Sequence, residues 1–200
     1  MQSACKIEGG NVKTIGVLAL QGAITEHLQM LVHLQVKAEP VKTREDLATV
    51  DALIIPGGES TAISRLIQQQ GLFNEIQKFA KTHPVLGTCA GLILCAKHII
   101  QSDNKVIPLD LIDMTVERNG FGRQVDSFET TLAVSNIADD IPAVFIRAPF
   151  IQSVGKDVKV LSVCDDKIVM AEQGNILVMS FHPELTKDTR VFEYFIKKIQ

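Results

Sequence analysis

The first hundred residues alternate between short, continuous apolar runs and longer segments whose apolar residues recur at helical spacing. The apolar runs at 13–20, 51–58 and 84–89 are rich in β-prone residues, as strands buried on both faces of a sheet are. A weaker strand pattern and several helical patterns fill the intervals, at 36–42 and at 24–34, 61–71, 73–82 and 91–99. This alternation predicts an α/β fold with an open, three-layer, mostly parallel sheet flanked by helices.

The second half of the chain has a different pattern. From residue 106 to residue 175 strand-like runs predominate and helical patterns are few, which predicts antiparallel or mixed strands that extend or edge the sheet. A last strand at 175–184 and a terminal helix at 187–199 close the chain. We find no linker or internal repeat, and therefore expect a single domain over 13–200 and an extension of unknown role at 1–12.

Composition excludes several classes of function. The chain has 200 residues, a formal net charge of -3 and no basic cluster, so neither nucleic acid nor an anionic membrane is an expected partner. No apolar run has the roughly 18 residues of a membrane span, and the first residues lack the apolar core of a signal peptide, so we expect a cytoplasmic protein. The four cysteines show no CxxC spacing and no Cys/His cluster, so no metal is expected and the thiols should be free.

The stretch "GTCAG" places Cys89 where a strand should become a helix. Small neighbours permit a sharp strand-to-helix turn that lifts a nucleophile out of the sheet. A helix N-terminus behind the sulfur favours the thiolate. The rival interpretation is a cysteine that only fills space in the core.

The stretch "FHPE" offers a base for that thiol. His182 and Glu184 are two residues apart on a segment that we expect to be extended, which would turn both side chains to one side. A carboxylate beside an imidazole fixes its tautomer and stabilises the imidazolium. A surface turn is the alternative for this tripeptide. The other four histidines have no such setting and are expected to be solvated or structural: His27, His33, His83 and His98.

The stretch "PGGEST" follows the expected strand at 51–58. Its glycines allow backbone N–H groups to point into a site, and together with the N–H of Ala90 they would form an oxyanion hole. A phosphate-binding loop is a rival interpretation of this stretch, but the Lys-Ser/Thr pair of a Walker motif is absent. The remaining alternative is an ordinary βα turn. Ser60 or Thr61 is expected to cap the next helix. Arg118 and Arg147 are candidates for binding a carboxylate in fork geometry.

Taken together and in this order, these stretches resemble the class I (triad-type) glutamine amidotransferases. Six stretches carry the resemblance: "IGVLALQGAITEH", "IIPGGEST", "GTCAGLIL", "VERNGFGRQ", "FIRAPFI" and "SFHPELT". They span residues 15–186. Two of them, "LALQGA" and "RNGFGRQ", are similar to the family of glutaminase subunits of pyridoxal 5'-phosphate synthase.

The resemblance implies a flavodoxin-like fold and a set of site residues. Cys89 would be the nucleophile, His182 the base and Glu184 the residue that orients it. The backbone N–H groups of Gly58 and Ala90 would form the oxyanion hole, and Gln21 would lie near that loop. The implied glutamine pocket contains Gly58, Glu59, Ser60, Arg118, Ile146 and Arg147.

The implied activity is hydrolysis of L-glutamine to L-glutamate and ammonia through a γ-glutamyl thioester, with no metal or organic cofactor. The implied partner is a (β/α)8-barrel synthase subunit in a large hetero-oligomer, which would use the ammonia to make pyridoxal 5'-phosphate. One alternative is a stand-alone thiol hydrolase such as a γ-glutamyl peptidase. The other is a binding subunit without chemistry, which would be indicated by loss of Cys89, His182 or Glu184.

Overall fold

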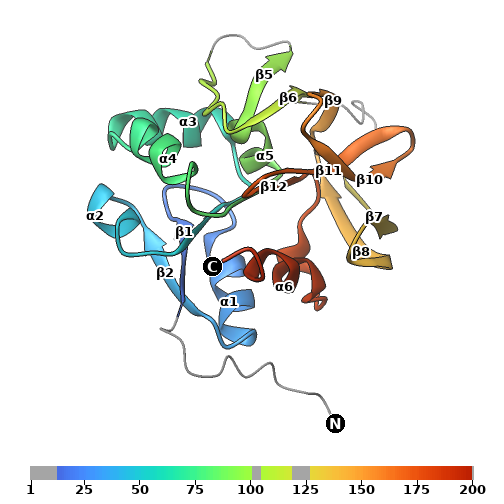
Figure 1. Ribbon diagram of the computed structural model, residues 1–200, viewed down its shortest axis with the longest axis horizontal. Helices are drawn as coiled ribbons and strands as arrows, with labels where there is room; N and C mark the ends of the chain where they lie inside the picture. The colour runs from blue at the N-terminus through green and yellow to red at the C-terminus, as the bar shows by residue number, and fades with distance from the viewer. Residues whose placement is uncertain (1–12, 101–104, 119–126, 200) are drawn as a thin grey trace.

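A ten-stranded mixed sheet forms the centre of the protein, in the order β2-β1-β3-β4-β12-β11-β9-β6-β5, with β10 paired to β11 (Figure 1). The computed structural model describes residues 13–100, 105–118 and 127–199. The expected extension at 1–12 and the part of the "RNGFGRQ" motif after Arg118 therefore lie outside the described residues.

The first half of the sheet is parallel, as the sequence predicts. Its neighbouring strands β2, β1, β3, β4 and β12 all run in the same direction. Their order is the doubly wound order of flavodoxin-like folds, in which ligands bind beyond the carboxyl ends of the strands. These strands are β1 (Thr14–Leu18), β2 (Lys37–Val41), β3 (Ala52–Ile55), β4 (Val85–Thr88) and β12 (Ile176–Met179).

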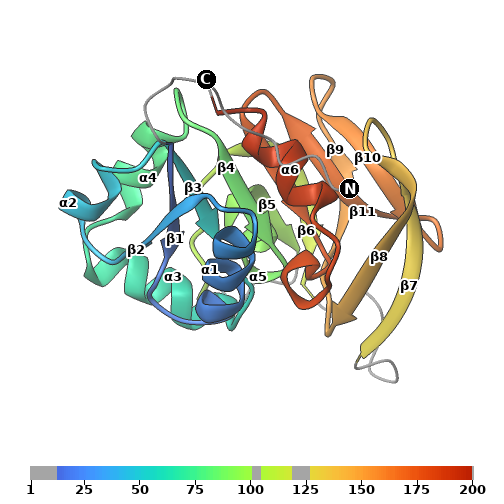
Figure 2. The ribbon, with the colours of Figure 1, turned by 90° about the horizontal axis from the view of Figure 1, so that it is seen from below.

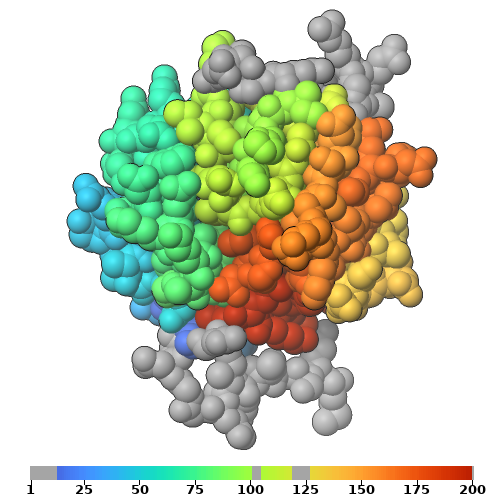
Figure 3. All heavy atoms as spheres, turned by 45° about the horizontal axis from the view of Figure 1, so that its top comes forward, coloured from blue at the N-terminus to red at the C-terminus, as the bar shows by residue number. Residues whose placement is uncertain are grey.

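The second half is mixed, which confirms the expectation for residues 106–175. Strands β12, β11, β9 and β6 pair antiparallel in turn and β10 pairs antiparallel with β11, whereas β5 and β6 are parallel. A separate hairpin, β7–β8, flanks the sheet. In the space-filling view, β5 and β6 lie between the green helices and the orange strands (Figure 3). Their bounds are β5 (Ala96–Ile100), β6 (Ile112–Glu117), β7 (Ser127–Val134), β8 (Ala138–Ile146), β9 (Phe150–Val154), β10 (Lys159–Cys164) and β11 (Lys167–Gln173).

Two apolar layers cover the two faces of the sheet, so the three-layer prediction is confirmed. Side chains of α2, α3, α4 and α5 pack against one face. Helices α1 and α6 and the β7–β8 hairpin lie on the other face (Figure 2), and their buried side chains pack into one cluster there. The helices are α1 (Ile24–His33), α2 (Arg44–Leu47), α3 (Ser60–Gln69), α4 (Phe73–Phe79), α5 (Ala90–Cys95) and α6 (Arg190–Ile196), with one 3₁₀ turn, η1 (Pro183–Leu185).

The helix expected at 91–99 is wrong in its second half. Helix α5 ends at Cys95, and the chain continues directly as the edge strand β5. Every residue of α5 is buried, whereas Lys97 and His98 are exposed. A longer helix on this path would carry these two polar side chains into the core, where they would have to give up their hydration. An edge strand lets them reach water.

The expected cap of α3 is also wrong. The N-cap is Glu59 rather than Ser60 or Thr61. Its carboxylate accepts hydrogen bonds from the backbone N–H groups of Thr61 (2.9 Å) and Ala62 (2.6 Å). A carboxylate satisfies two orphan N–H groups at once and also complements the helix dipole, which a single hydroxyl does less well.

Candidate active site

Four loops meet beyond the carboxyl ends of β1, β3, β4 and β12, which are neighbours in the sheet. They surround a cleft of about 530 Å³, a size typical of small-ligand sites. Every site residue expected from the sequence lines this cleft except Glu184, which lies behind His182. The lining residues are Gln21, Ala23, Glu26, Gly57, Gly58, Glu59, Ser60, Cys89, Ala90, Ile93, Arg118, Ile146, Arg147, Pro149, His182 and Leu185.

Cys89 occupies a strained turn between β4 and α5. Its backbone has φ 48° and ψ -101°, a conformation that L residues other than glycine rarely adopt. The turn needs small neighbours, because a Cβ on Gly91 would lie 2.0 Å from the carbonyl oxygen of Ile55. The N–H of Cys89 donates to the carbonyl of Met179 at 2.8 Å, which ties the turn to the end of β12. The side chain therefore reaches the cleft while remaining largely buried.

His182 and Glu184 form a buried pair. The Nδ1 atom of His182 lies 2.6 Å from Oε1 of Glu184. The sequence predicts an extended segment here, but residues Pro183–Leu185 form the 3₁₀ turn η1 instead. Proline favours the first position of a helical turn, and the tight turn brings the carboxylate back onto the imidazole. The pairing is thus observed, although the expected geometry was wrong.

The cleft places Cys89 and His182 on either side of Gly57. A Cβ on this glycine would lie 2.4 Å from Cε1 of His182 and 3.4 Å from Cβ of Cys89. Any side chain at residue 57 would therefore displace the imidazole of His182 from its position beside Cys89. The absence of a side chain keeps the thiol and the imidazole in one compartment.

The charges of His182 and Glu184 reinforce each other. Burial alone would lower the pKa of His182, but hydrogen bonds and charge from Cys89 and Glu184 outweigh it and raise the pKa to about 10. Burial opposes the charged form of Glu184 too, yet its hydrogen bond with His182 and the positive charge of that imidazolium keep its pKa below the usual value. At neutral pH the pair is therefore an imidazolium and a carboxylate, with the proton of His182 available beside the thiol.

The loop after β3 is held in a defined orientation. The carbonyl of Gly57 accepts from the N–H of Ala23 at 2.9 Å, and the N–H of Glu59 donates to Oε1 of Gln21 at 2.8 Å. In a trans peptide the N–H points opposite to the C=O, so the N–H of Gly58 points away from Ala23. The Gln21 side chain thus supports the loop directly, where the sequence placed it only nearby.

Glu59 and Arg118 meet at the rim of the cleft. Nη2 of Arg118 lies 3.3 Å from Oγ1 of Thr61 and 3.8 Å from Oε1 of Glu59. Burial opposes the charge of Glu59, but the N–H groups at the start of α3 lower its pKa overall. Ser60 is buried at the same helix start. Arg118 is therefore held near the cleft by the loop after β3.

Ile146 and Arg147 reach the opposite side of the cleft. The run "AVFIRAPFIQSV" is not one strand, because the chain turns at Arg147, which has φ 42°, between β8 and β9. The carbonyl of Ile146 lies 3.9 Å from Sγ of Cys89. This bend points the segment at the thiol and leaves both side chains exposed at the cleft.

His27 was expected to be solvated or structural, and the structure places it against the His182–Glu184 pair. Its Nε2 atom lies 3.1 Å from Oγ1 of Thr88 and 3.6 Å from Oε1 of Glu184, and the side chain is completely buried. A signal was present in the sequence: His27 lies three residues after Ile24 and four before Leu31, on the apolar face of α1.

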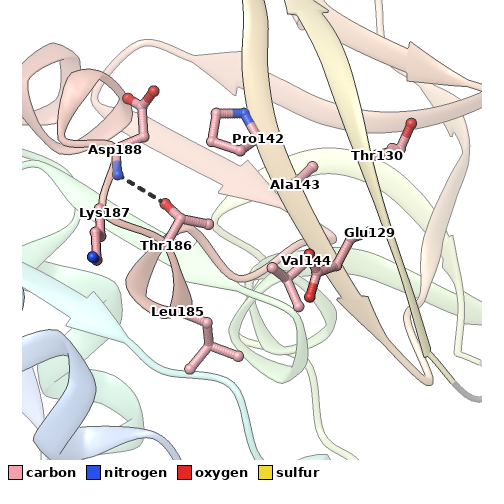
Figure 4. A pocket seen from close by; sticks show the side chains of 9 residues that line it. All are labelled: Glu129, Thr130, Pro142, Ala143, Val144, Leu185, Thr186, Lys187 and Asp188. Carbon is pink, nitrogen blue, oxygen red and sulfur yellow. Dashed lines mark hydrogen bonds between the residues drawn. The ribbon is translucent and has the colours of Figure 1, made fainter.

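The segment that carries the pair is docked on the β7–β8 hairpin. The backbone N–H of His182 donates to the carbonyl of Val144 at 2.8 Å. On the far side of this contact a second hollow separates the hairpin from residues 185–188, where the N–H of Asp188 donates to Oγ1 of Thr186 at 3.1 Å (Figure 4). The hairpin therefore braces the histidine segment from outside the sheet.

Within the described residues 13–100, 105–118 and 127–199, no group of three or more His, Cys, Asp or Glu side chains is placed to hold a metal ion. Within the same ranges, no helix has the length and apolar character needed to cross a membrane.

The strand order, with a cysteine turn after β4 and a His-Glu pair after β12, is the architecture of the class I glutamine amidotransferases. A solved structure described as a glutamine amidotransferase is 42% identical to this chain, with a TM-score of 0.88 over 92% of this chain and 98% of its own. The structure of PurLQS from Thermotoga maritima shares the fold at 16% identity, with a TM-score of 0.67 over 94% of this chain and 99% of its own.

The chain belongs to the SNO glutamine amidotransferase family, whose model matches residues 17–200. A relative from Brevibacillus brevis, "Pyridoxal 5'-phosphate synthase subunit PdxT", is 51% identical over 93% of this chain and 97% of its own length. A protein of the same name from Shouchella clausii is 52% identical over 92% of this chain and 94% of its own length. The resemblance inferred from the sequence motifs is therefore confirmed.

Proposed function

We propose that this chain hydrolyses L-glutamine to L-glutamate and ammonia, as the glutaminase subunit of a pyridoxal 5'-phosphate synthase. The observation that carries the proposal is that Cys89 and His182 line one cleft, with Glu184 hydrogen-bonded to His182 from behind. Relatives about half identical over nearly the whole chain bear the name of that synthase subunit, which favours this function over a stand-alone γ-glutamyl peptidase.

The reaction starts with the Cys89 thiolate, which attacks the side-chain amide carbon of glutamine. The oxyanion that forms accepts hydrogen bonds from the N–H groups of Gly58 and Ala90. The imidazolium of His182 gives its proton to the departing ammonia as the C–N bond breaks, leaving a γ-glutamyl thioester. Glu184 stabilises the positive charge of His182 throughout.

Water completes the cycle. The neutral imidazole of His182 takes a proton from a water molecule, whose oxygen attacks the thioester carbon. The C–S bond breaks, glutamate leaves and Cys89 returns as the thiolate beside a protonated His182. One glutamine and one water thus become one glutamate and one ammonia, without a metal or organic cofactor.

The glutamine pocket is assigned to residues around the thiol. Arg118 and Arg147 are the partners for the α-carboxylate, and a single direct contact is sufficient. The remaining proposed lining is Gly58, Glu59, Ser60 and Ile146. Exposure of Arg147 at the cleft and the position of Arg118 at its rim support this assignment.

A second protein must consume the ammonia. We assign this role to a (β/α)8-barrel synthase subunit in a large hetero-oligomer in the cytoplasm. Uncoupled hydrolysis would waste glutamine, so docking of the partner is expected to act on the loop at Gln21 and Gly22. Two hydrogen bonds link this loop to the peptides around Gly58, which gives docking a physical route to the oxyanion hole.

The test is glutaminase activity of the purified chain with and without the synthase subunit. We expect the rate at saturating glutamine to rise by about an order of magnitude or more on addition of the partner, because losing one oxyanion donor costs roughly 10²–10³ in rate. A free chain that already hydrolyses glutamine at the rate of the complex would favour the stand-alone hydrolase.

A further inference from the structure

His27 is a buried imidazole between α1 and the His182–Glu184 pair. Its Nε2 atom faces Oγ1 of Thr88 at 3.1 Å and Oε1 of Glu184 at 3.6 Å. The ring also makes a T-shaped contact with Phe192 of α6, with 5.7 Å between the ring centroids. The reaction steps above make no use of this side chain.

The ring is neutral at neutral pH. The titratable groups that face it are Glu184, His182 and Glu26. Burial lowers the pKa of His27, and His182 lowers it further, against the opposing charges of Glu184 and Glu26. Since His182 already neutralises Glu184, a second buried cation would have no partner of its own.

The hydrogen bonds also select the tautomer. Nδ1 of His27 has no hydrogen-bond partner among the described residues. A proton on Nδ1 would leave a buried N–H donor unsatisfied and would turn the lone pair of Nε2 toward the Glu184 carboxylate. A proton on Nε2 avoids both costs, so the ring presents an N–H to Thr88 and Glu184.

Thr88 extends this contact to the other side of the cleft. Its Oγ1 atom also accepts the backbone N–H of Gly57 at 3.1 Å. Thr88 immediately precedes Cys89, and Gly57 precedes the proposed oxyanion donor Gly58. One hydroxyl oxygen therefore joins His27 to the loop after β3 and to the nucleophile turn.

We propose that His27 is a positioning residue that holds Glu184 against His182: its neutral ring directs one N–H at both Thr88 Oγ1 and Glu184 Oε1. The contact to Glu184 is longer than a hydrogen bond and acts through the N–H dipole. The other oxygen of Glu184, Oε2, has no hydrogen-bond partner within the described ranges. His27 and His182 thus both face Oε1 of the Glu184 carboxylate. This inference rests on the proposed function.

The test compares His27→Leu with His27→Gln. The amide of glutamine can place a neutral N–H near the position of Nε2, whereas leucine cannot. With the synthase subunit present, we expect His27→Leu to lower kcat for glutamine hydrolysis by about 10-fold, the upper end of the range for a neutral hydrogen bond, with little change in KM, because the variant loses the hydrogen bond to Thr88 and the longer contact to Glu184. His27→Gln should stay within about 3-fold of the unmodified chain. His33→Gln, on the exposed side of the same helix, is the matched control.

A second readout separates positioning from packing. The pH dependence of iodoacetamide alkylation at Cys89, followed on its peptide by mass spectrometry, reports the thiolate without any glutamine. A displaced Glu184 would stabilise the His182 imidazolium less, so the apparent pKa of the Cys89 thiol should rise in His27→Leu and stay in place in His27→Gln. Because alkylation needs no hydrolysis, it tests His27 even if the proposed glutaminase function fails.

The proposal is overturned if both variants keep kcat and the thiol pKa, if both lose activity equally, or if the thiol pKa falls in His27→Leu. If His27→Leu does not fold, Thr88→Val and Thr88→Ser test the same contact from the other partner. Valine should reproduce the loss and the pKa shift, and serine should preserve both values. Unchanged behaviour of Thr88→Val would reject the proposal.

Discussion

The carbonyl oxygen of Gly57 accepts a 2.9 Å hydrogen bond from the backbone N–H of Ala23. This contact requires a glycine at residue 22, which has φ 110° and whose Cβ would lie 1.9 Å from the same oxygen. Gly22→Ala should therefore displace the Gly57–Gly58 peptide. We expect kcat to fall roughly 10²-fold, the cost of one oxyanion donor, in glutaminase assays with the synthase subunit.

Gly174→Ala is the matched control for this experiment. Gly174 also has a positive φ, 56°, but its Cβ would meet nothing within 4 Å. It should cost stability of about 1 kcal/mol and leave kcat unchanged. Equal kcat values for the two variants would show that the Gly57 carbonyl contact does not control the reaction.

Cys89 should be the one thiol among the described cysteines that reacts quickly. Burial raises the pKa of Cys95 to about 12 and also raises the pKa of Cys164, so both are thiols at neutral pH. A diazo-ketone analogue of glutamine should label Cys89, and Cys89→Ala should abolish hydrolysis while keeping the fold. Peptide mapping checks the label. Labelling mainly at Cys95 or Cys164, or an active Cys89→Ala variant, contradicts the assignment.

Glu184→Gln should reduce turnover by roughly 10²–10⁴, by analogy with other triads, because it removes the charge that stabilises the imidazolium. His182 has its pKa raised from 6.5 to about 10, so the protonated form needed to expel ammonia persists through neutral pH and is lost as pH rises toward that value. The alkaline fall of kcat should therefore move to lower pH in Glu184→Gln. Steady-state rates over pH measure this shift, and an unmoved profile with normal turnover would make Glu184 a structural residue.

The same pair predicts how stability depends on pH. A raised folded-state pKa of His182 means that its contribution is fully present below about pH 6.5 and is lost as pH rises through about 10. Glu184, with a lowered pKa, contributes above its usual value and loses that contribution in acid. Chemical denaturation at several pH values should show an alkaline loss of stability that is smaller in His182→Asn. An equal loss in both proteins would assign the effect to other groups.

Arg118→Ala and Arg147→Ala test the pocket. If either guanidinium binds the α-carboxylate as proposed, its removal should raise KM for glutamine by roughly 10-fold, the cost of a lost charge-assisted hydrogen bond. Arg65→Ala, an exposed change on α3, is the control. Should kcat/KM stay unchanged in both pocket variants, the glutamine α-carboxylate must bind elsewhere.

The strands were predictable because their signal is local. The runs at 13–20, 51–58 and 84–89 are apolar over most of their length, as is typical of a strand covered on both faces, and all three contribute neighbouring parallel strands. The stretches "PGGEST", "GTCAG" and "SFHPEL" could also be placed at one sheet edge, because each follows a parallel strand and the carboxyl ends of parallel strands lie at the same edge.

The errors arose where tertiary contacts decide. No glycine or proline marks the end of α5, and only the free edge beside β6 explains why the chain extends after Cys95. The cap of α3 is an exception, because Glu59 contacts the nearby N–H groups of Thr61 and Ala62. His27 was expected to be solvated or structural, and its contacts with Thr88 and Glu184 could not be foreseen because those residues come from segments 61 and more residues away. Contacts of this range leave no pattern in a short stretch of sequence.

The backbone of Cys89 is held at φ 48° and ψ -101°. At this residue the requirement for a thiol therefore conflicts with the stability of the fold. Strain of this kind costs on the order of 1–3 kcal/mol, and glycine would relieve most of it. A duplicated copy released from hydrolysing glutamine would thus gain stability by mutating its nucleophile first. Among related sequences, a cysteine retained at this turn therefore indicates continued selection for catalysis, and this can be seen without an assay.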